Sequence, residues 1–438
     1  MNRRIAQLLF SVLAIGLVVV AVLLLFGSFR LTRLELTDIF LFSSTMVLFV
    51  FLLTLVLRYL ALLVLAFLQH LRYANRSKEL TEYPSVTVVV PAYNEERVIE
   101  ACIRSVMELD YPNLETIVVD DGSSDHTYYV ASKLIERYGS DRLRVLTQPN
   151  SGKATALNHG ISHARGEILL CVDADSRLEP DAVLKAIPNF NDPTIGAVAG
   201  NVRVANRRNL LTRLQALEYI EGLNLVRAAQ AVVGRVAVVP GPVGFFRKTV
   251  MDEIGGYTTD TYAEDCELTL RIMLSGWKIQ YEPQAIAWTE APEDARALFQ
   301  QRYRWGRGIL QAINKHRGQL LRPAPDPLSW AMLWMLAFES VALPAMDIIG
   351  MLVFIFAGIT GGLSPLIVLW WVQLAILDTV IAMYCVVLDR EDVTLPVYAV
   401  LYRLYFVPFV DLMRFFAWLD ELFEIRMGWL RLERLGRI

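Results

Sequence analysis

The sequence predicts an α/β domain with a mostly parallel sheet, inserted between apolar segments long enough to cross a membrane. The chain of 438 residues is 55% apolar and has a mean hydropathy of +0.40, which is too high for an ordinary soluble protein. From residue 84 to about 290, however, β-branched runs alternate with amphipathic stretches. Such β/α units build a parallel sheet that binds its ligand at the carboxyl ends of the strands.

Composition excludes several other classes of protein. The formal net charge of -3 gives no global field that would favour a nucleic-acid partner. The four cysteines are scattered without CxxC pairing, and the five histidines have no metal-ligand spacing with them. We therefore expect neither a zinc site nor a disulfide scaffold, and we expect the cysteines to be small buried side chains in a reducing compartment.

Residues 1–72 are predicted to form two transmembrane helices, from about Ile5 to Phe26 and from about Ile39 to Leu68, with Arg58 as the interruption of the second run. A signal peptide is rejected because no small-residue cleavage site is clear and a second apolar run follows. Basic residues flank both ends of this hairpin: Arg3, Arg4, Arg72, Arg76 and Lys78. By the positive-inside rule, both ends and the domain that follows face the cytosol.

The domain at 84–290 begins with three predicted strands: 86–90, 116–120 and 143–146. An amphipathic helix starts near Asn94 with its apolar positions on one face (Val98, Ile99, Cys102, Ile103 and Val106), and another helix follows Lys153. The buried run from Glu167 to Asp173 is the central strand.

Carboxylates gather where these strands end: Glu95, Asp120, Asp121, Asp173 and Asp175. Each alone is more often a helix cap or a turn residue. Nothing in folding requires all of them on one rim, so together they favour a site. Asp173 and Asp175, at i and i+2 where a strand breaks into a turn, can converge on one hard cation.

The second half of the domain gives weaker signals. A helix is expected over about 210–231, with Glu218 and Glu221 at a domain interface, and a Gly/Pro turn followed by a strand is expected over 240–247. Glu264 and Asp265 open a further helix, where acids suit the N-terminus. Residues 291–325 carry seven basic residues and no acid from Ala295 onwards, which predicts an amphipathic helix at the headgroup level.

The region 329–423 contains three further apolar runs, at about 330–359, 366–388 and 395–419. A charge at the bilayer centre costs roughly 2.5 to 3.5 kcal/mol, so the ionisable residues in these runs should face a polar interior or one another. They are Glu339, Asp347, Asp378, Arg403, Asp411 and Arg414. A saccharide channel and pairing between helices explain them equally well.

The topology of this region contains a conflict. Three crossings would place the C-terminus outside, yet the tail at 424–438 is basic and therefore favours the cytosol. Either the last run is interfacial or re-entrant, or the number of crossings differs from three.

Six motifs in order resemble membrane-embedded family 2 glycosyltransferases, such as the cellulose, chitin, hyaluronan and poly-N-acetylglucosamine synthases. They span about 215 residues: PAYNEE at 91–96, VDDGS at 119–123, GKATALN at 152–158, DAD at 173–175, AED at 263–265 and QRYRW at 301–305. The last is specific to the membrane-embedded synthases. The resemblance implies a nucleotide-sugar-binding GT-A fold.

By this resemblance, Asp173 and Asp175 hold Mg²⁺ or Mn²⁺ on the diphosphate, and Asp265, beside Glu264 in the catalytic motif, is the general base. The remaining roles concern donor and acceptor. Tyr93, Glu95 and Asp120 line the uridine pocket, Asp121 lies near the ribose or diphosphate, Lys153 contacts the nucleotide sugar, Gln301 and Arg304 face the diphosphate, and Trp305 stacks on the acceptor sugar. The loop at 240–247 either binds acceptor or serves packing alone.

The resulting expectation is a processive inverting β-glycosyltransferase of the inner (plasma) membrane. It polymerises a UDP-sugar onto a growing glycan and passes the product outward among membrane lipids. The arrangement of helices favours UDP-N-acetylglucosamine, although hyaluronan, chitin or glucan synthesis fits the motifs as well. Two alternatives stay open: single transfer to a membrane lipid, and a non-catalytic subunit that binds a nucleotide sugar or conducts a glycan. The chain lacks an RxxxR and DxSxxG module, so control by cyclic di-GMP would need an accessory regulatory subunit.

Overall fold

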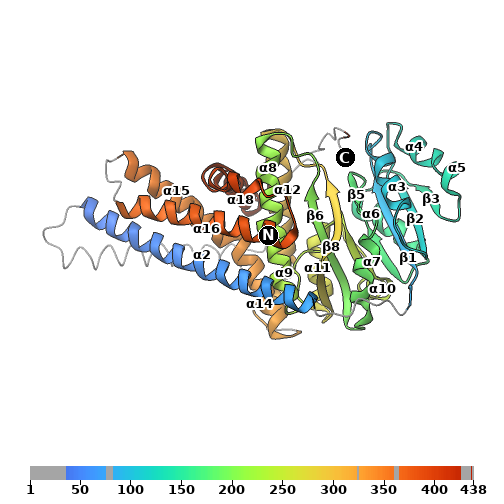
Figure 1. Cartoon of the computed structure of the whole chain (residues 1–438), viewed down its shortest axis with the longest axis horizontal. Coiled ribbons are helices and arrows are strands. Elements are labelled where there is room, and N and C mark those ends of the chain that lie inside the picture. The colour runs from blue at the N-terminus through green and yellow to red at the C-terminus, as the bar shows by residue number, and fades with distance from the viewer. Residues whose placement is uncertain (1–35, 75–81, 323–324, 360–364, 426–435, 437–438) are drawn as a thin grey trace.

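The computed structural model describes residues 36–74, 82–322, 325–359, 365–425 and 436. A sheet-containing domain lies at one end and a group of long helices at the other (Figure 1). The predicted helix from Ile5 to Phe26 and nearly all of the basic tail lie outside the described residues.

The domain is built on an eight-stranded sheet in the order β3-β2-β1-β4-β7-β6-β8-β5. Its strands are β1 (Val86–Ala92), β2 (Leu114–Asp120), β3 (Leu143–Thr147), β4 (Ile168–Cys171), β5 (Ser176–Leu178), β6 (Ile195–Val204), β7 (Gly244–Arg247) and β8 (Lys278–Thr289). The four strands from β3 to β4 are parallel, as predicted. The other half is mixed, because β7 runs antiparallel to both β4 and β6, and β5 runs antiparallel to β8. The expectation of a mostly parallel sheet is therefore wrong for that half.

The first β/α units fold as their apolar pattern predicts. All seven residues of β1 are buried, and alternate side chains enter opposite cores. Val88 packs in the core that contains α3 (Ile99–Met107), whereas Val89 packs in the core that contains α6 (Lys153–Ser162). Helices on both faces thus fix the carboxyl ends of β1, β2 and β4 at one edge. The remaining helices on this side are α4 (Thr127–Lys133), α5 (Ile135–Tyr138), α7 (Ala182–Ala186), the 3-10 helix η1 (Ile187–Asn191) and α10 (Lys248–Ile254).

The helix predicted over 210–231 is present, but its centre is π-helical. It consists of α8 (Leu210–Leu217), the π-helix η2 (Glu218–Asn224) and α9 (Leu225–Ala231). π-helical segments are rare and often occur at functional sites. Two more interrupt the apolar helices: η3 (Phe338–Ala342) and η5 (Tyr402–Phe406).

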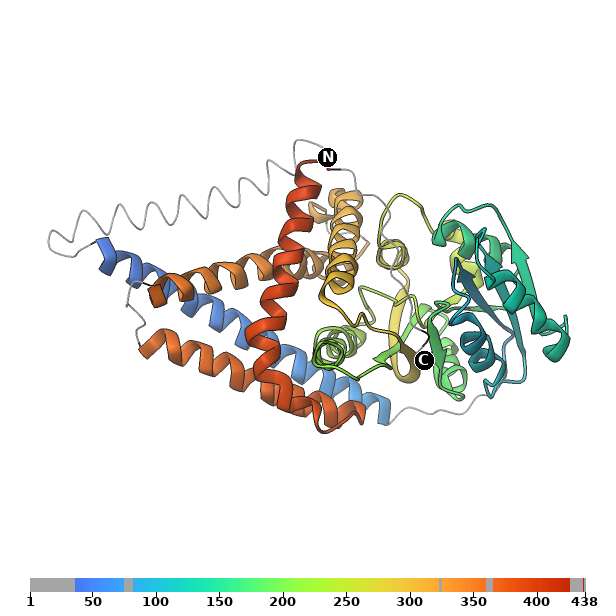
Figure 2. The same cartoon turned by 90° about the horizontal axis from the view of Figure 1, so that it is seen from above.

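Within the described residues, four helical stretches are long and apolar enough to cross a membrane: 49–73, 327–352, 371–389 and 395–422. They belong to α2 (Leu36–Ala74), α14 (Pro327–Ala337) with α15 (Leu343–Ile359), α16 (Pro365–Asp389), and the series η4 (Leu395–Tyr398), α17 (Ala399–Leu401), η5 and α18 (Val407–Leu422). In Figure 2, α2, α15 and α16 share one general direction, and α18 runs across it. The last apolar run therefore lies at an angle to the other long helices.

The amphipathic segment at 295–325 forms α12 (Ala295–Lys315) and α13 (Arg317–Leu320). α12 packs against α18, to which it is tied by polar contacts. Arg307 Nε lies 3.0 Å from Glu421 Oε2, Gln311 Nε2 donates to the same oxygen at 3.2 Å, and the Tyr303 hydroxyl bonds Asp420. These contacts connect the helix that carries QRYRW to the helix that lies across the apolar group.

Candidate active site

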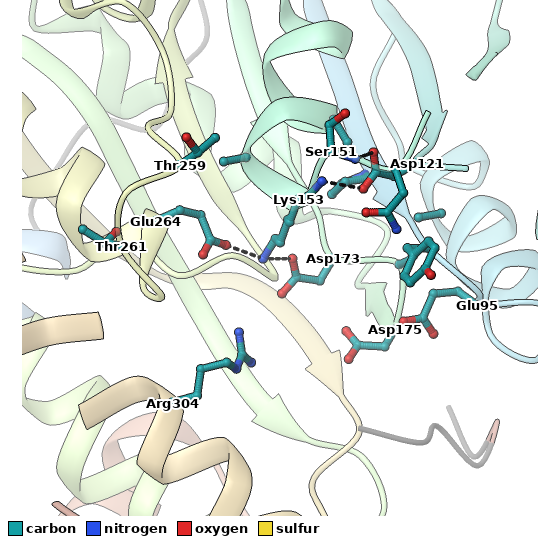
Figure 3. A pocket seen from close by; sticks show the side chains of 18 residues that line it. Glu95, Asp121, Ser151, Lys153, Asp173, Asp175, Thr259, Thr261, Glu264 and Arg304 are labelled. Carbon is teal, nitrogen blue, oxygen red and sulfur yellow. Dashed lines mark hydrogen bonds and ion pairs between the residues drawn. The ribbon is translucent and has the colours of Figure 1, made fainter. Parts of the chain in front are cut away.

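A cleft of about 630 Å³ opens at the carboxyl ends of β1, β2 and β4. Eight of the predicted site residues line it: Tyr93, Glu95, Asp121, Lys153, Asp173, Asp175, Glu264 and Arg304. They come from segments up to 211 residues apart in the sequence, since Tyr93 follows β1 and Arg304 lies on α12. Figure 3 shows how the seven of them that it labels surround the same space. The predicted gathering of acids on one rim is thus observed.

Lys153 is the central cation of this cleft. Its Nζ lies 2.6 Å from Asp173 Oδ1 and 3.0 Å from Glu264 Oε1, so one ammonium joins the strand-end acid to the first residue of α11 (Glu264–Leu274) (Figure 3). Burial lowers the pKa of Lys153, but Asp173 and Glu264 outweigh this effect and raise it. Lys153 therefore stays charged at neutral pH. Nothing in the isolated Ser-Gly-Lys motif could show these two partners.

Asp121 shapes the loop that presents Lys153. Its Oδ1 accepts hydrogen bonds from Gln148 Nε2 at 2.7 Å and from the Ser151 amide at 2.9 Å, and its Oδ2 accepts from the Gly152 amide at 2.8 Å. Asp120 lies just beneath the cleft and is buried; its Oδ2 accepts from the Ser123 amide at 3.3 Å. Its Oδ1 has no hydrogen-bond partner among the described residues. A buried carboxylate oxygen of this kind suits a ligand donor.

Asn94 belongs to the PAYNEE motif, but the sequence alone predicted no role for it in the site. It adopts the left-handed conformation at φ 56°, and its side-chain oxygen accepts hydrogen bonds from the amides of Ser124 at 2.7 Å and Asp125 at 3.3 Å. Its own amide donates to Ser123 Oγ at 2.9 Å. Asn94 thereby joins the turn after β1 to the turn after β2 and fixes the sheet edge at which Tyr93 lines the cleft.

Asp173 and Asp175 both line the cleft and provide the hard oxygen ligands that Mg²⁺ and Mn²⁺ prefer. Within the described ranges, no group of three or more His, Cys, Asp or Glu side chains is arranged to hold a metal ion. Mg²⁺ commonly binds one or two carboxylates and takes its other ligands from water and substrate phosphates. The donor set therefore fits a cation whose coordination a diphosphate would complete.

A second, smaller pocket of about 190 Å³ adjoins this cleft. We call it the acceptor-side pocket. It shares Lys153, Asp173, Asp175, Glu264 and Arg304 with the cleft and adds Asp265, Gln301 and Trp305. Gly241 of the predicted loop lies against the shared wall, where an added Cβ would be 2.9 Å from both Asp173 Oδ2 and Lys153 Nζ. A side chain there would meet the ion pair, so the loop can approach the charged groups closely only with glycine at this position.

The pKa values of Asp265 and Glu264, which are neighbours in the sequence, are shifted in opposite directions. Burial and the Glu264 charge raise the pKa of Asp265 to about 6. Burial would also raise the pKa of Glu264, but Lys153 and Arg304 lower it. Adjacent carboxyls with opposite shifts are typical of acid/base sites, and a base with a pKa near 6 is ionised at neutral pH while still able to accept a proton.

Trp305 has one neighbour that sequence reasoning missed. The Arg302 guanidinium lies 4.3 Å from the centre of the Trp305 ring, and its Nε contacts Glu218 Oε1 at 3.0 Å and Oε2 at 3.1 Å. Arg302 also donates to the Gln301 side chain. The buried pair between α12 and η2 therefore holds the indole on one side, while Trp305 still lines the acceptor-side pocket.

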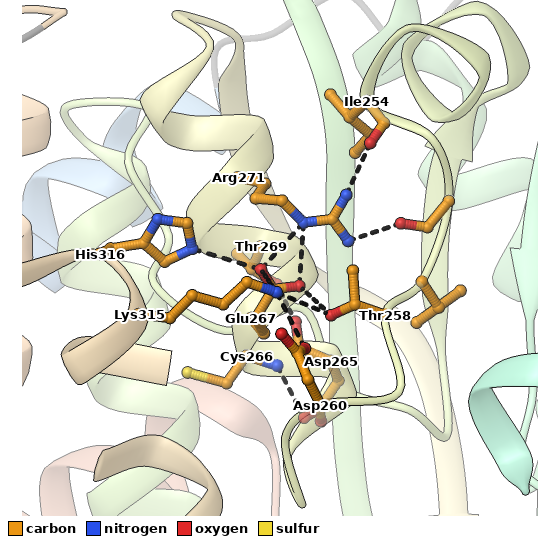
Figure 4. Close-up of polar contacts among 12 residues, drawn as sticks. Ile254, Thr258, Asp260, Asp265, Cys266, Glu267, Thr269, Arg271, Lys315 and His316 are labelled. Carbon is orange, nitrogen blue, oxygen red and sulfur yellow. Dashed lines mark hydrogen bonds and ion pairs between the residues drawn. The ribbon is translucent and has the colours of Figure 1, made fainter. Parts of the chain in front are cut away.

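Glu267, one turn into α11, fixes the loop that precedes the helix (Figure 4). Its fully buried carboxylate accepts from Thr258 Oγ1 at 2.9 Å and from Arg271 Nε at 2.9 and 3.0 Å, and it contacts Lys315 Nζ at 2.9 Å and His316 Nε2 at 3.3 Å. Burial would raise its pKa, but His316, Lys315 and Arg271 lower it to about 2. This network joins the end of α12 to α11, the helix that carries Asp265.

The contact between α12 and the start of α11 is also very close. A Cβ added at Gly308 would lie 2.3 Å from the backbone nitrogen of Ala263 and 2.5 Å from its Cβ. Only glycine allows the backbone of α12 to approach the residue before Glu264 in this way. The distance between α12, which carries Arg304 and Trp305, and the start of α11, which carries Asp265, is therefore set at this point by direct backbone contact at Gly308.

A third pocket, of about 150 Å³, lies among the apolar helices; we call it the membrane-level pocket. Five of the six ionisable residues predicted from the apolar runs line it, and the sixth, Asp378, pairs with one of them. Arg58 Nη2 lies 2.6 Å from Glu339 Oε1, Arg403 Nη2 donates to Asp378 Oδ1 at 2.8 Å, and Arg414 Nη1 donates to Asp411 Oδ1 at 3.2 Å. η2, η3 and η5 all contribute residues to its wall: Glu218, Glu221, Gly222, Leu223, Glu339, Tyr402, Arg403 and Phe406. Pairing between helices is thus observed, together with a polar cavity.

Comparisons with known proteins agree with this geometry. The family model described as "Glycosyltransferase like family 2" matches residues 84–308. The poly-beta-1,6-N-acetyl-D-glucosamine synthase of Staphylococcus aureus (strain COL) is 35% identical over 279 residues, which cover 63% of this chain and 66% of the relative. The enzyme of the same name from Staphylococcus epidermidis is 32% identical over 231 residues, covering 52% of this chain and 56% of the relative. The chain thus matches just under two thirds of the length of the first relative.

One solved structure shows the same fold. A mannosyltransferase from Pyrobaculum calidifontis, in complex with GDP-Man and Mn²⁺, superimposes with a TM-score of 0.63 at 22% identity, covering 86% of this chain and 100% of the other. The GT-A fold predicted for the domain is therefore confirmed.

Proposed function

The chain belongs to family 2 of the glycosyltransferases, and on this premise we propose that it is a processive, inverting β-glycosyltransferase that builds a polysaccharide from a UDP-sugar. UDP-N-acetylglucosamine is the proposed donor, which the printed activity of the staphylococcal relatives supports. The observation that carries the proposal is the shared wall between the two pockets. Lys153, Asp173, Asp175, Glu264 and Arg304 face both, while Asp265 and Trp305 line the acceptor-side pocket alone.

This arrangement supports a single displacement. The donor would lie in the cleft at the strand ends, with its diphosphate near Asp173, Asp175 and Arg304. An acceptor sugar would stack on Trp305, whose indole suits the apolar face of a pyranose. Asp265 would take the proton of the acceptor hydroxyl as its oxygen attacks the anomeric carbon, and the bond to the diphosphate breaks with its electrons. One displacement on an α-linked donor gives a β-linked product.

Charge stabilisation of the leaving diphosphate is assigned to three groups of this chain. Arg304 points toward the shared acids from α12 (Figure 3), and Lys153 can exchange a carboxylate for a phosphate oxygen. Asp173 and Asp175 would hold Mg²⁺ or Mn²⁺, which supplies electrostatic stabilisation of the diphosphate when bound. Asp120 Oδ1 is proposed to accept a hydrogen bond from the nucleotide, because it is buried without a partner among the described residues.

We further propose that the product leaves through the apolar helices of a multi-pass inner (plasma) membrane protein whose catalytic domain is cytosolic. Leu223 of η2 lines both the acceptor-side and the membrane-level pocket, which supports a route between them. The crossing direction of α18 supports an interfacial last segment (Figure 2). A cytosolic C-terminus then follows, and the basic tail obeys the positive-inside rule.

The test is an incorporation assay with purified protein in lipid and Mg²⁺ or Mn²⁺. UDP-N-acetylglucosamine, UDP-glucose and UDP-glucuronate are each supplied with a radiolabel, separately and combined, and the products are sized on a gel. High-molecular-weight label from UDP-N-acetylglucosamine is the expected result. Label confined to a small, organic-extractable product would instead establish single transfer to a lipid, and absence of UDP release from any donor would contradict the proposal.

A further inference from the structure

Arg227 differs from every other buried arginine in the described part of the chain. Four of these arginines have a carboxylate partner: Arg235 with Asp326, Arg302 with Glu218, Arg307 with Glu421 and Arg403 with Asp378. Arg227, on α9, is 6% exposed and has no carboxylate within ion-pair distance among the described residues. Burial lowers the pKa of its guanidinium. The charge of Asp265 acts on this guanidinium but forms no ion pair with it, so its burial is only partly compensated and folding alone does not account for this residue.

The guanidinium of Arg227 is held by neutral groups that leave one end of it available. Its Nε donates to the Val238 carbonyl at 3.3 Å, and its Nη1 donates to Asn224 Oδ1 at 3.2 Å. Asn224 is itself oriented, because its Nδ2 donates to Asn201 Oδ1 at 2.8 Å. Nη2 makes no hydrogen bond within the described residues, and Arg227 lines the acceptor-side pocket that contains Asp265 and Trp305. A fixed, planar donor thus faces the pocket.

The walls beside this donor indicate which chemical group it would bind. Val202, Leu223 and Val238 line the same pocket and supply an apolar surface. A carboxylate would pair with Arg227 but would meet the four acids that line the pocket: Asp173, Asp175, Glu264 and Asp265. A hydroxyl alone would leave the apolar surface unused. An acetamido group satisfies both features, because its carbonyl oxygen accepts from the guanidinium and its methyl packs on the aliphatic side chains.

We propose that Arg227 binds the acetamido carbonyl of the acceptor sugar and thereby makes the acceptor-side pocket selective for N-acetylated glycan ends. This proposal rests on the proposed function and assigns a specificity-determining residue to it. The donor sugar is not involved, because Arg227 lines the acceptor-side pocket and is absent from the wall of the larger cleft.

The test measures transfer from UDP-N-acetylglucosamine by the full chain in lipid vesicles to two acceptors. One is a β-1,6-linked N-acetylglucosamine trimer, and the other is the same trimer without its acetyl groups. Arg227→Gln is expected to raise KM for the acetylated trimer by about tenfold or more, the loss expected for a hydrogen bond to a charged group. KM for the deacetylated trimer should rise much less, and this difference between the two trimers is the result expected.

Two further measurements separate binding from a structural role. Arg227→Ala should regain affinity for the acetylated trimer when a few millimolar guanidinium ion is added, at a concentration far below that which unfolds the chain. Arg208→Gln, which changes an exposed arginine absent from both pocket linings, serves as the matched control and should behave as wild type. Unchanged KM in Arg227→Gln, or an equal rise in KM for both trimers, would overturn the inference alone. A wild-type chain that transfers to neither trimer and forms no polymer overturns the proposed function, and the inference with it.

Discussion

The shared wall of the active site and the membrane-level pocket are both crowded with charge, but the charges are arranged differently. At the shared wall, one ammonium at Lys153 serves both Asp173 and Glu264, and the charge of Arg304 acts on Glu264 as well. In the membrane-level pocket, Arg58 and Arg403 each make two hydrogen bonds with one carboxylate. A shared cation can exchange partners when a substrate arrives, whereas a bidentate pair resists exchange. We expect this difference between the proposed reacting site and a site that holds helices together.

The largest expected effect is at the reacting site. Asp265→Asn removes the proposed base and keeps its shape, so turnover should fall by roughly 10²- to 10⁴-fold while UDP affinity changes little. The measurements are radiolabel incorporation and calorimetric titration with UDP. Asp252→Asn, an exposed carboxyl on α10, is the control. Near-native incorporation by Asp265→Asn would refute its role.

The bidentate pairs should respond through stability. Arg403→Met leaves Asp378 buried without its partner, which typically costs about 3 to 5 kcal/mol. Thermal unfolding in detergent should show a clear loss. The double variant Arg403→Met, Asp378→Leu should recover part of it, because an apolar pair replaces the buried ion pair and only the longer contact of Arg403 with Asp347, at 3.6 Å, stays lost. A double variant no more stable than Arg403→Met would indicate that the pair has a role beyond holding the helices.

Metal removal should act on the cleft and leave the membrane-level pocket unaffected. With EDTA, or in Asp175→Ala, UDP affinity should fall by about tenfold or more, since a divalent cation no longer offsets the diphosphate charge. The thermal midpoint without nucleotide should change little. Equal UDP affinity with and without Mg²⁺ would count against the assignment of Asp173 and Asp175.

The smallest effect is a shift in pH dependence. Asp265 has a pKa raised to about 6 and must be deprotonated to act as the base, so kcat/KM should fall about tenfold per pH unit below that value. Because the Glu264 charge contributes to the rise, Glu264→Gln should move this limb to lower pH in whatever activity remains. A limb that stays in place would mean that a different group controls it.

Much of this site could be predicted from sequence because its residues lie in short motifs at the ends of strands, where local pattern and position coincide. The antiparallel direction of β7 could not be predicted, because a strand of four residues beginning with glycine carries no information about which strands lie beside it. The partner of Arg58 could not either, because Glu339 lies 281 residues away and only packing unites them. Arg227 and Glu267 could not be predicted either. Each lies on an ordinary helical stretch, and its interactions depend on residues that are distant in the sequence. The π-helical segments could not be predicted, because the spacing of apolar residues does not distinguish them from α-helix.

The glycine contact between α12 and Ala263 bears on any attempt to redesign this enzyme for another sugar. Since a single methyl at position 308 would overlap the backbone before Glu264, the two walls of the acceptor-side pocket already stand at their minimum separation. Moving the helices apart would displace Asp265, the proposed base, together with Trp305, so we expect activity to fall before the pocket is enlarged. Engineering for bulkier or smaller acceptors should therefore begin with the aliphatic lining at Val202, Leu223 and Val238, where volume can change without altering the helix spacing.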